Sequence, residues 1–311
     1  MAHHLVDNSR LGIHSHGLIR VPQYIAEIRE GELDPRARPT LERAQGAVVW
    51  ITGNNGFGAV GGTIAARQAI TTARKHGIAL VLATHLAHTG RLGAYAELIA
   101  ASGCIATIYG SGPPRGHMVA PFGGIDGRLS TNPIAYALPN RQTPVVADFS
   151  TSALPEGKIR SARNLGRRLP AGVLQDPEGN PVDDPAVLYA TPRGTLLPLG
   201  GPDFGHKGYA LAILVEAMGT LLAGQETNDQ DREDFNLAIV AIAAPRGFGP
   251  ATQRMTTYLK SSRPRDPNRP VIVPGDPERI ARENAFVEVD PPTWKAMKEI
   301  ARELGVDLPP E

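Results

Sequence analysis

The sequence predicts a mixed α/β protein whose sheet is mixed or largely antiparallel. Helical and strand patterns are interspersed along 311 residues, and 41% of the residues are hydrophobic, enough for a sizeable core. The late strand patterns follow short turns, whereas a parallel array would place helices between them. The 34 glycines and 28 prolines show no Gly-X-Y period, which indicates a turn-rich globular chain and excludes collagen and wholesale disorder.

The first half of the chain mixes helices with short apolar strands. A helix over 21–30 is expected to stop at Gly31. Helical spacing of apolar residues and short aliphatic runs identify the others. In order, these are a strand over 47–51, a turn at 53–56, a helix over 62–76, a strand over 78–83, a helix over 91–101, and strands over 104–109, 134–138 and 145–148.

The second half begins with a change of pattern. Charged residues, glycine and proline dominate 157–193, which predicts an excursion of helix and loop. The clearest helix, 209–222, is apolar nearly all round and is therefore predicted to be buried. The remaining predictions are a strand over 235–243, a long connection over 247–274 with a helix inside it, and surface helices over 276–284 and 292–304.

The net charge and the cysteine content exclude several classes of protein. There are 32 Lys and Arg against 31 Asp and Glu, a net charge of +1, which argues against nucleic-acid or membrane-surface binding. No apolar run reaches the roughly 18 residues of a membrane span. The first residues are too polar for a signal peptide. A single cysteine, Cys104, excludes an intrachain disulfide and suits a reducing cytoplasm.

A glycine motif at 56–61 matches the G-x-G-x-x-G fingerprint of dinucleotide-binding turns. It follows a predicted strand and opens a predicted helix, as a pyrophosphate site requires. The next strand, however, has no acidic residue at its end to hold a ribose, and the βαβ unit does not recur. We therefore favour the alternative that these glycines make a tight turn and allow close helix packing.

Histidines pair at His14 and His16 and again at His85 and His88. They could ligate zinc, act as acid and base, or simply bond to backbone at a strand end. Zinc needs three or four ligands, and no third ligand is recognisable beside either pair. Arg20 lies four residues after His16, so on a helix both would point the same way and the arginine could clamp a carboxylate. An ordinary surface ion pair is the alternative for Arg20.

A serine hydrolase is not indicated. Ser15 lies beside His16, but adjacent residues on a regular element point apart, and the chain has no G-x-S-x-G motif.

Short motifs in a fixed order extend over nearly the whole chain. They occupy 12–17 with Arg20, 53–58, 88–90, 95–96, 120–124, 130–133, 148–152, 157–158, 196–201, 205–209 and 274–276. Together they resemble the malate/L-lactate dehydrogenase-like oxidoreductases, a non-Rossmann lineage that includes ureidoglycolate dehydrogenase. No single motif decides this resemblance, but the ordered set is specific.

The resemblance implies a fold, a cofactor and an activity. The enzyme would transfer a hydride between NAD or NADP and a small 2-hydroxy, 2-oxo or cyclic 2-imino acid, such as malate, lactate or ureidoglycolate. The cofactor would lie on a largely antiparallel, non-Rossmann sheet domain over 76–249, with a helical excursion at about 157–195. Residues 1–75 and 250–311 would form a helical substrate and dimerisation part of a homodimer.

The resemblance also implies roles for individual residues. His88 would be the acid and base, with His16 as a second catalytic candidate, and Ser15 and Arg20 would bind the substrate, Arg20 through its carboxylate. The cofactor would contact Ser111, Gly112, Thr131, Asn132, Asp148, Phe149, Ser150, Lys207, Gly208, Gly275 and Asp276. No residue is assigned to a metal. A proton donor, a carboxylate clamp and a held cofactor ring are together what hydride transfer needs.

Four departures from the family pattern bear on these expectations. The chain begins roughly one helical hairpin later than is usual, which bears on dimer packing. His14 stands where aspartate is common. The loop 111–117 is longer, so either Ser111 or Gly112 could meet the cofactor ribose. His85, three residues before His88, could tune it or merely sit beside it.

Two other functions remain open at this point. The paired histidines could serve a zinc-dependent hydrolase. A shortened paralogue without activity could keep the fold as a binding module, although His88, Arg20, Asp148 and Lys207 are all retained.

Overall fold

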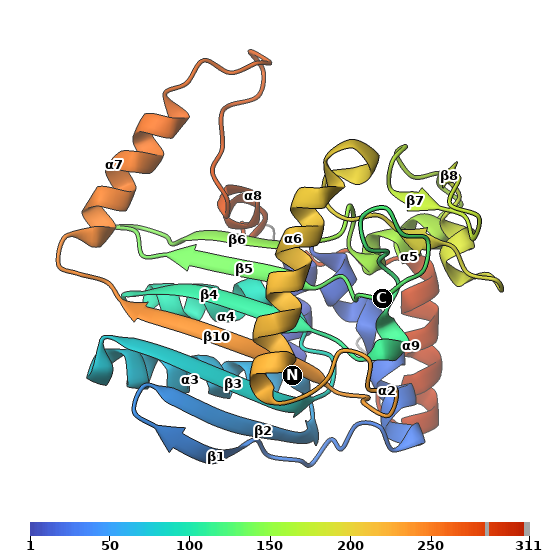
Figure 1. The fold of residues 1–311 in the computed structure, drawn as a ribbon, viewed down its shortest axis with the longest axis horizontal. Helices are drawn as coiled ribbons and strands as arrows, with labels where there is room; N and C mark the ends of the chain where they lie inside the picture. Colours follow the sequence, from blue (N-terminus) through green and yellow to red (C-terminus); the bar gives the residue numbers. More distant parts are fainter. Residues whose placement is uncertain (284–285, 308–311) are drawn as a thin grey trace.

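A seven-stranded sheet forms the centre of the protein, whose computed structural model describes residues 1–283 and 286–307 (Figure 1). The strands lie in the order β1 (Thr40–Gln45), β2 (Val48–Gly56), β3 (Ile78–Leu86), β10 (Phe235–Ala243), β4 (Cys104–Ser111), β5 (Pro133–Leu138) and β6 (Val145–Ser150). Strands β2 and β3 pair in parallel, and the other neighbours in this sheet pair antiparallel. The predicted mixed α/β fold with a largely antiparallel sheet is confirmed.

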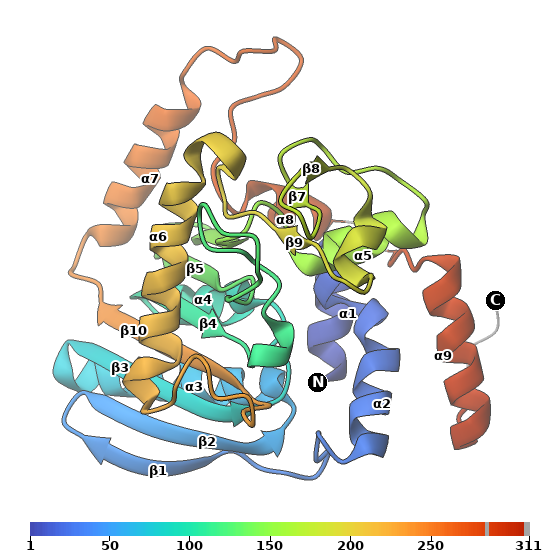
Figure 2. The same cartoon turned by 45° about the vertical axis from the view of Figure 1, so that its right-hand side comes forward.

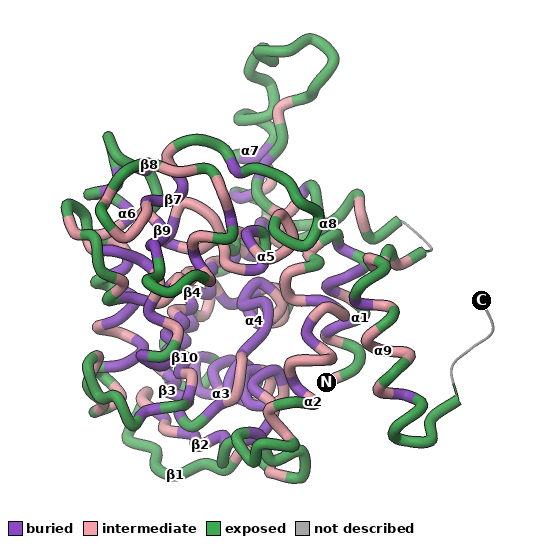
Figure 3. Tube along the Cα trace, turned by 90° about the vertical axis from the view of Figure 1, so that its right-hand side faces the viewer, coloured by how far each residue is buried: buried purple, intermediate pink, exposed green. Residues whose placement is uncertain are grey.

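Helices cover both faces of the sheet. Helices α3 (Gly58–His76) and α4 (Leu92–Ala101) pack on one face, and α6 (Gly201–Gly219) crosses the other (Figures 1 and 2). The central strands β3 and β10 are consequently almost entirely apolar, as strands covered on both sides must be. Figure 3 shows the buried trace following α3, α4 and these strands.

The predicted turn at 53–56 is wrong, because these residues are an irregularity within β2. Asn54 and Asn55 have positive φ angles of 52° and 57°, and the β2–β3 register shifts between Thr52 and Gly56. Asparagine tolerates this left-handed conformation, so the strand bulges instead of ending. Strand β1 was not predicted, because its six residues are all exposed and mostly polar.

Helix α6 is not buried all round as predicted. It lies on the outside of the sheet and turns one side inward, where Ala212, Val215 and Gly219 are among the buried residues. Its outer side leaves Ile213 51% and Leu214 43% exposed. The helix also begins at Gly201, eight residues before the predicted start, because Gly205 and Gly208 do not interrupt it.

A second, smaller core lies beside the main sheet. It contains a three-stranded sheet of β8 (Pro181–Val182), β7 (Leu174–Gln175) and β9 (Thr195–Leu196), together with α5 (Glu156–Asn164) and the 3-10 helix η4 (Pro185–Tyr189). Its buried side chains include Ile159, Leu174 and Leu196. The predicted excursion therefore contains short strands as well as helix and loop.

The remaining helices flank the sheet. These are α1 (Ala2–Arg10), α2 (Val21–Glu30), α7 (Phe248–Lys260), α8 (Asp276–Ala281) and α9 (Pro291–Leu304), with the 3-10 helices η1 (His14–His16), η2 (Leu18–Arg20), η3 (Pro114–Gly116) and η5 (Leu221–Ala223). Helix α9 packs on α2 at the edge of the molecule (Figure 2). The helix predicted over 276–284 ends at Ala281, and Asn284 lies outside the described residues.

Strands β1 and β2, which precede residue 76, belong to the main sheet, and the division into two domains stays a prediction. Among the described residues, every helix is too short or too polar to cross a membrane.

Candidate active site

His88 lies in the loop that leads from β3 to α4, with its ring enclosed by three other rings. Its Nδ1 atom is 2.8 Å from the Tyr24 hydroxyl oxygen on α2. The His16 ring stacks on it at 5.5 Å between centroids and 11° between planes. Phe235, at the start of β10, meets it edge-on at 5.6 Å. The ring is therefore held in one orientation by contacts from three elements.

The glycine motif at 56–61 packs closely against the β3–α4 loop that contains His88. A Cβ atom at Gly58, the first residue of α3, would lie 2.2 Å from the Ala87 carbonyl oxygen and 2.5 Å from that of His88. A Cβ at Gly61 would lie 2.2 Å from the Leu86 side chain. Close packing, one of the two purposes proposed for these glycines, therefore accounts for them. Helix α3 begins at Gly58, four residues before the predicted start.

Ser15 and His16 occupy η1, beside His88. The Ser15 Oγ atom lies 3.0 Å from His16 Nδ1. The expectation that these neighbours point apart was wrong, because a 3-10 turn lets the short serine side chain reach the adjacent ring. Gly157 of α5 packs against this turn so closely that a Cβ atom there would lie 2.4 Å from Ser15 Cβ.

Arg20 is buried, with 6% of its surface exposed, and its guanidinium holds several segments together. Nε donates to the Ser15 carbonyl oxygen at 2.7 Å, and Nη1 donates to Gln23 Oε1 at 2.6 Å. Nη2 lies 3.5 Å from Glu156 Oε2 on α5. The alternative of an ordinary surface ion pair is therefore wrong, because the pair is buried beside Ser15.

The surroundings favour the neutral form of both histidines. Burial, followed by the charges of Arg20, His16, His4 and Arg160, holds the pKa of His88 well below its usual value. Burial and the Arg20 charge lower the pKa of His16 to about 3. Burial raises the pKa of the Tyr24 phenol, which therefore stays protonated. Near neutral pH, the His88 ring is therefore unprotonated.

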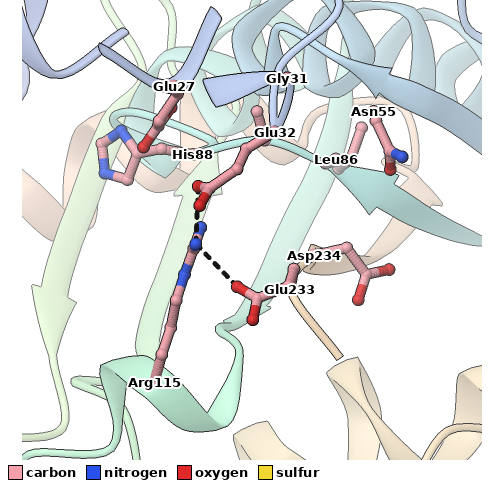
Figure 4. A pocket seen from close by; sticks show the side chains of 10 residues that line it. Glu27, Gly31, Glu32, Asn55, Leu86, His88, Arg115, Glu233 and Asp234 are labelled. Carbon is pink, nitrogen blue, oxygen red and sulfur yellow. Dashed lines mark hydrogen bonds and ion pairs between the residues drawn. The ribbon is translucent and has the colours of Figure 1, made fainter. Parts of the chain in front are cut away.

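A cavity of about 150 Å³ opens beside His88 (Figure 4). Arg115 lies across it and pairs with Glu32 and Glu233, each at 2.7 Å. The other lining residues are Glu27, Gly31, Asn55, Leu86, Ala87 and Asp234. Of the predicted catalytic and substrate-binding residues, His88 alone lines this cavity.

The predicted cofactor residues of β6 and the loop before β5 lie together. Strand pairing sets Pro133 opposite Ser150 and Ile134 opposite Phe149. Asp148 Oδ2 accepts a hydrogen bond from the Gly93 N–H at 2.7 Å, which ties β6 to the start of α4. Phe149 remains 37% exposed.

Thr131 and Asn132 form that loop and are tied to their surroundings. The Thr131 carbonyl oxygen accepts from the Thr151 N–H at 3.0 Å. Asn132 is completely buried, and its Nδ2 atom donates to Glu216 Oε2 of α6 at 3.0 Å. Its φ of 36° turns the chain sharply into β5. The loop is therefore fixed to α6 and β6.

The remaining predicted cofactor residues are spread around this group. Lys207 of α6 is exposed, and a Cβ atom at Gly208 would lie 2.4 Å from the Leu199 carbonyl oxygen. Ser111 is 2% exposed and accepts a hydrogen bond from Thr220 at 2.8 Å. Gly112 accepts from Arg232 through its carbonyl oxygen at 2.8 Å. Ser111 and Gly112 are therefore engaged within the fold.

Gly275 and Asp276 lie at the opposite end of β6 from Ser150. The Val146 N–H donates to the Pro274 carbonyl oxygen at 3.2 Å, which places the start of α8 beside this end of β6. Asp276 Oδ2 is 2.6 Å from Lys260 Nζ. Burial raises the pKa of Asp276, but bonds from Lys260 and the Val273 N–H outweigh it and hold the pKa below its usual value. This carboxylate is already paired.

Sequence reasoning missed Tyr24, Glu156 and Phe235, which bond to or pack on the predicted residues. Tyr24 follows Arg20 by one helical turn, so an apolar-face analysis of 21–30 could have placed it near Arg20. Glu156 is 136 positions from Arg20, and no local pattern indicates that pair. His85, by contrast, is exposed and its N–H donates to Asp234.

Among the described residues, no group of three or more His, Cys, Asp or Glu side chains is placed so that it could hold a metal ion. The zinc-hydrolase alternative is therefore not favoured by the geometry, and the relatives of the chain point to a different chemistry.

Comparisons with known proteins agree on one family. The family described as malate/L-lactate dehydrogenase matches residues 1–298. Hydroxycarboxylate dehydrogenase B of Escherichia coli K12 is 33% identical over 323 aligned residues, which cover 98% of this chain and 87% of that protein. An L-lactate dehydrogenase of Cupriavidus necator is 32% identical, covering 99% of this chain and 91% of its own length.

Solved structures show the same similarity in three dimensions. Malate dehydrogenase from Entamoeba histolytica superposes with a TM-score of 0.90 at 27% identity, over 99% of this chain and 91% of that one. Sequence and fold therefore agree over almost the full length, and the chain belongs to the malate/L-lactate dehydrogenase family of oxidoreductases.

Proposed function

We propose that the protein transfers a hydride between NAD or NADP and a small 2-hydroxy acid or the corresponding 2-oxo acid. The observation that carries this proposal is His88, a neutral histidine with a fixed ring at the wall of a cavity. Relatives named for malate, lactate and sulfolactate support the substrate class. A structural neighbour named as a reductase of a cyclic imino acid supports the wider class of 2-imino acids.

The predicted catalytic and substrate-binding residues would have separate roles in such a reaction. In the oxidation, His88 would take the hydroxyl proton of the hydroxy acid while the hydrogen on C2 is lost as a hydride. Arg20 holds the carboxylate by exchanging its weak, 3.5 Å contact with Glu156 for a bidentate one. Ser15 and His16, which lie beside His88 and off the cavity wall, are proposed to contact the substrate there. His88 returns the proton when the reaction runs toward the hydroxy acid.

Several predicted cofactor residues have the properties that a dinucleotide requires. Phe149 offers an exposed ring, and Lys207 offers an exposed ammonium whose donors suit a ribose or phosphate oxygen. Asp148, Ser150, Thr131 and Asn132 adjoin Phe149 through strand and loop pairing. A nicotinamide cofactor bound here supplies or receives the hydride. Lys207 and Phe149 are the residues that would contact it, and the buried residues would hold them in place.

The assembly is proposed to be a homodimer in the cytoplasm. Exposed apolar side chains on α6 and η5, including Ile213, Leu214, Leu221 and Leu222, support the burial of this side against a second copy. Light scattering after gel filtration is expected to give twice the 33.1 kDa chain mass. A monomer at micromolar concentration would contradict this part of the proposal.

The direct test is an assay of 2-oxo acids and cyclic imines with NADH and with NADPH. We expect turnover with at least one pair, and we expect the His88→Asn variant to lose about 10²- to 10⁴-fold in kcat while retaining cofactor binding. The His16→Asn variant is the matched comparison. If only the His16 variant loses turnover, the roles of the two histidines are reversed. If the wild type reduces none of the acids, the proposal fails.

A further inference from the structure

The bond between Tyr24 and His88 carries an inference beyond the roles assigned above. Tyr24 is 4% exposed, and its hydroxyl lies 2.8 Å from His88 Nδ1. In the part of the chain that the structure describes, no carboxylate is bonded to this ring. The charged or titratable groups that act on it are His16 of η1, Arg20 of η2, His4 of α1 and Arg160 of α5.

We propose that Tyr24 is a positioning residue, whose hydroxyl oxygen accepts the Nδ1 proton of His88 and leaves Nε2 to exchange the substrate proton. This inference rests on the proposed dehydrogenase function, because it assigns a task to Nε2. A neutral imidazole has one N–H and one acceptor nitrogen. If the hydroxyl donated to Nδ1 instead, Nε2 would carry the proton and could not accept another.

The same hydrogen bond serves both directions of the reaction. During oxidation, Nε2 takes the hydroxyl proton of the substrate as the hydride leaves for the nicotinamide, and Nδ1–H continues to donate to Tyr24. During reduction, Nε2 gives that proton to the substrate oxygen and the ring returns to its starting tautomer. Tyr24 gains and loses nothing, so the step balances with the substrate and the nicotinamide alone.

A phenol has a different effect on His88 from a carboxylate. A carboxylate bonded to Nδ1 would stabilise the imidazolium and raise the pKa of His88. Tyr24 is neutral, because burial raises the pKa of its phenol. It can therefore orient the ring while the pKa of His88 remains low, as burial and nearby cations dictate. The base stays unprotonated near neutral pH and still has a defined tautomer.

Tyr95 provides a matched control in the same region. It is 1% exposed, and its hydroxyl donates to the carbonyl oxygen of Thr89, the residue after His88. Tyr95→Phe thus removes a buried phenol hydroxyl close to the site without touching the His88 ring. The Tyr95→Phe variant therefore measures how far the loss of a buried hydrogen bond lowers turnover through reduced stability alone.

The first experiment reads the tautomer directly and needs no turnover. Nitrogen NMR of full-length, ¹⁵N-histidine-labelled protein is recorded at about pH 7, with the His88 signals identified by their absence in His88→Asn. We expect the proton on Nδ1 in the wild type and in Tyr95→Phe, and a mixture of both tautomers in Tyr24→Phe. A wild-type proton on Nε2, or an unchanged tautomer in Tyr24→Phe, would overturn the proposal.

The second experiment is the pH profile of kcat for the oxidation. Tyr24→Phe is expected to lower kcat by about 10- to 100-fold, a usual effect of losing the partner that orients a functional histidine, with KM little changed. Its acidic limb is expected to move to lower pH, because the lost bond was stronger to the imidazolium than to the neutral ring. Tyr95→Phe is expected to keep the wild-type limb.

Equal displacement of the limb in both variants, or wild-type kinetics in Tyr24→Phe, would contradict the proposal. Should the wild type turn over none of the acids tested, the dehydrogenase proposal fails, while the NMR result still decides whether Tyr24 sets the tautomer of His88.

Discussion

The single side chain of Arg20 connects several segments of this site. Its guanidinium bonds the backbone of η1, a side chain of α2 and a carboxylate of α5, so it links three segments around Ser15. Burial lowers the pKa of Arg20, but an arginine remains charged in any folded protein. This cation is the group that we propose to bind the carboxylate of the substrate.

We predict that Arg20→Lys lowers kcat/KM for 2-oxo acids far more than for a carbonyl compound without an acid group. An ammonium cannot reproduce the planar fork that grips a carboxylate. Steady-state kinetics on both substrates check this. Glu156→Gln, which removes the paired charge but leaves Arg20 in place, is the matched control and should keep the preference for acids. Equal losses on the two substrates in Arg20→Lys would indicate a structural role.

At the level of elements, the β2–α3–β3 unit shows why a fingerprint-like motif need not bind a nucleotide. Strands β2 and β3 are parallel, and α3 connects them. The motif glycines lie where α3 meets the loop that carries His88, with less room than a methyl group needs. Close backbone packing accounts for Gly58 here.

We predict that Gly58→Ala destabilises the protein by about 1–3 kcal/mol, the range for overpacking a filled site, and also lowers kcat. The added methyl group would have to displace the backbone of Ala87 and His88. Urea denaturation and turnover measure the two effects. Gly61→Ala, whose methyl group would meet only the flexible Leu86 side chain, should cost stability with a smaller loss of kcat.

Lys207, on helix α6, is a candidate contact for the nicotinamide cofactor. We predict that Lys207→Met weakens NADH or NADPH binding with little change in melting temperature, because the ammonium is exposed and its donors would be lost. Fluorescence titration measures the affinity. Lys75→Met, which removes an equally exposed lysine from the end of α3, controls for surface charge.

If Gly58→Ala abolished cofactor binding while Lys207→Met retained it, the cofactor would lie at the glycine motif and the proposed site would be wrong.

At the scale of the whole molecule, the packing of α1, η1 and the β3–α4 loop buries histidines that must stay neutral. The pKa of His4 is lowered to about 4 by burial and the charges of Arg91 and the N-terminus. His16 and His88 are shifted in the same direction. In the unfolded chain each would return to about 6.5.

We predict that the free energy of unfolding falls as the pH drops from about 6.5 to about 5. Over this window the unfolded chain binds more protons than the native one, so acid favours unfolding. The slope has a ceiling of about 1.4 kcal/mol per pH unit for each histidine, and partial exposure of these rings lowers it. Urea denaturation at several pH values measures the slope. His4→Gln should flatten it, and a wild-type stability constant over this range would refute the prediction.

Local patterns in the chain were sufficient for the fold class, for most helices and strands and for the family. The spacing of apolar residues and the order of short motifs are properties of neighbouring residues, so they can be recognised without a structure. Helix 21–30 and strand 235–243 were predicted with the bounds that α2 and β10 show. Strand β1, being polar and exposed, has no such pattern.

Three-dimensional packing alone established which side chains meet around His88 and which side of α6 is exposed. Tyr24 is 64 positions from His88, and Glu156 is 136 positions from Arg20. Helix α6 is apolar on both sides, so its composition could not tell which side meets the sheet. Contacts of this kind depend on how distant segments pack, and the free energy of that packing is shared over the whole core, so no short stretch of sequence contains it.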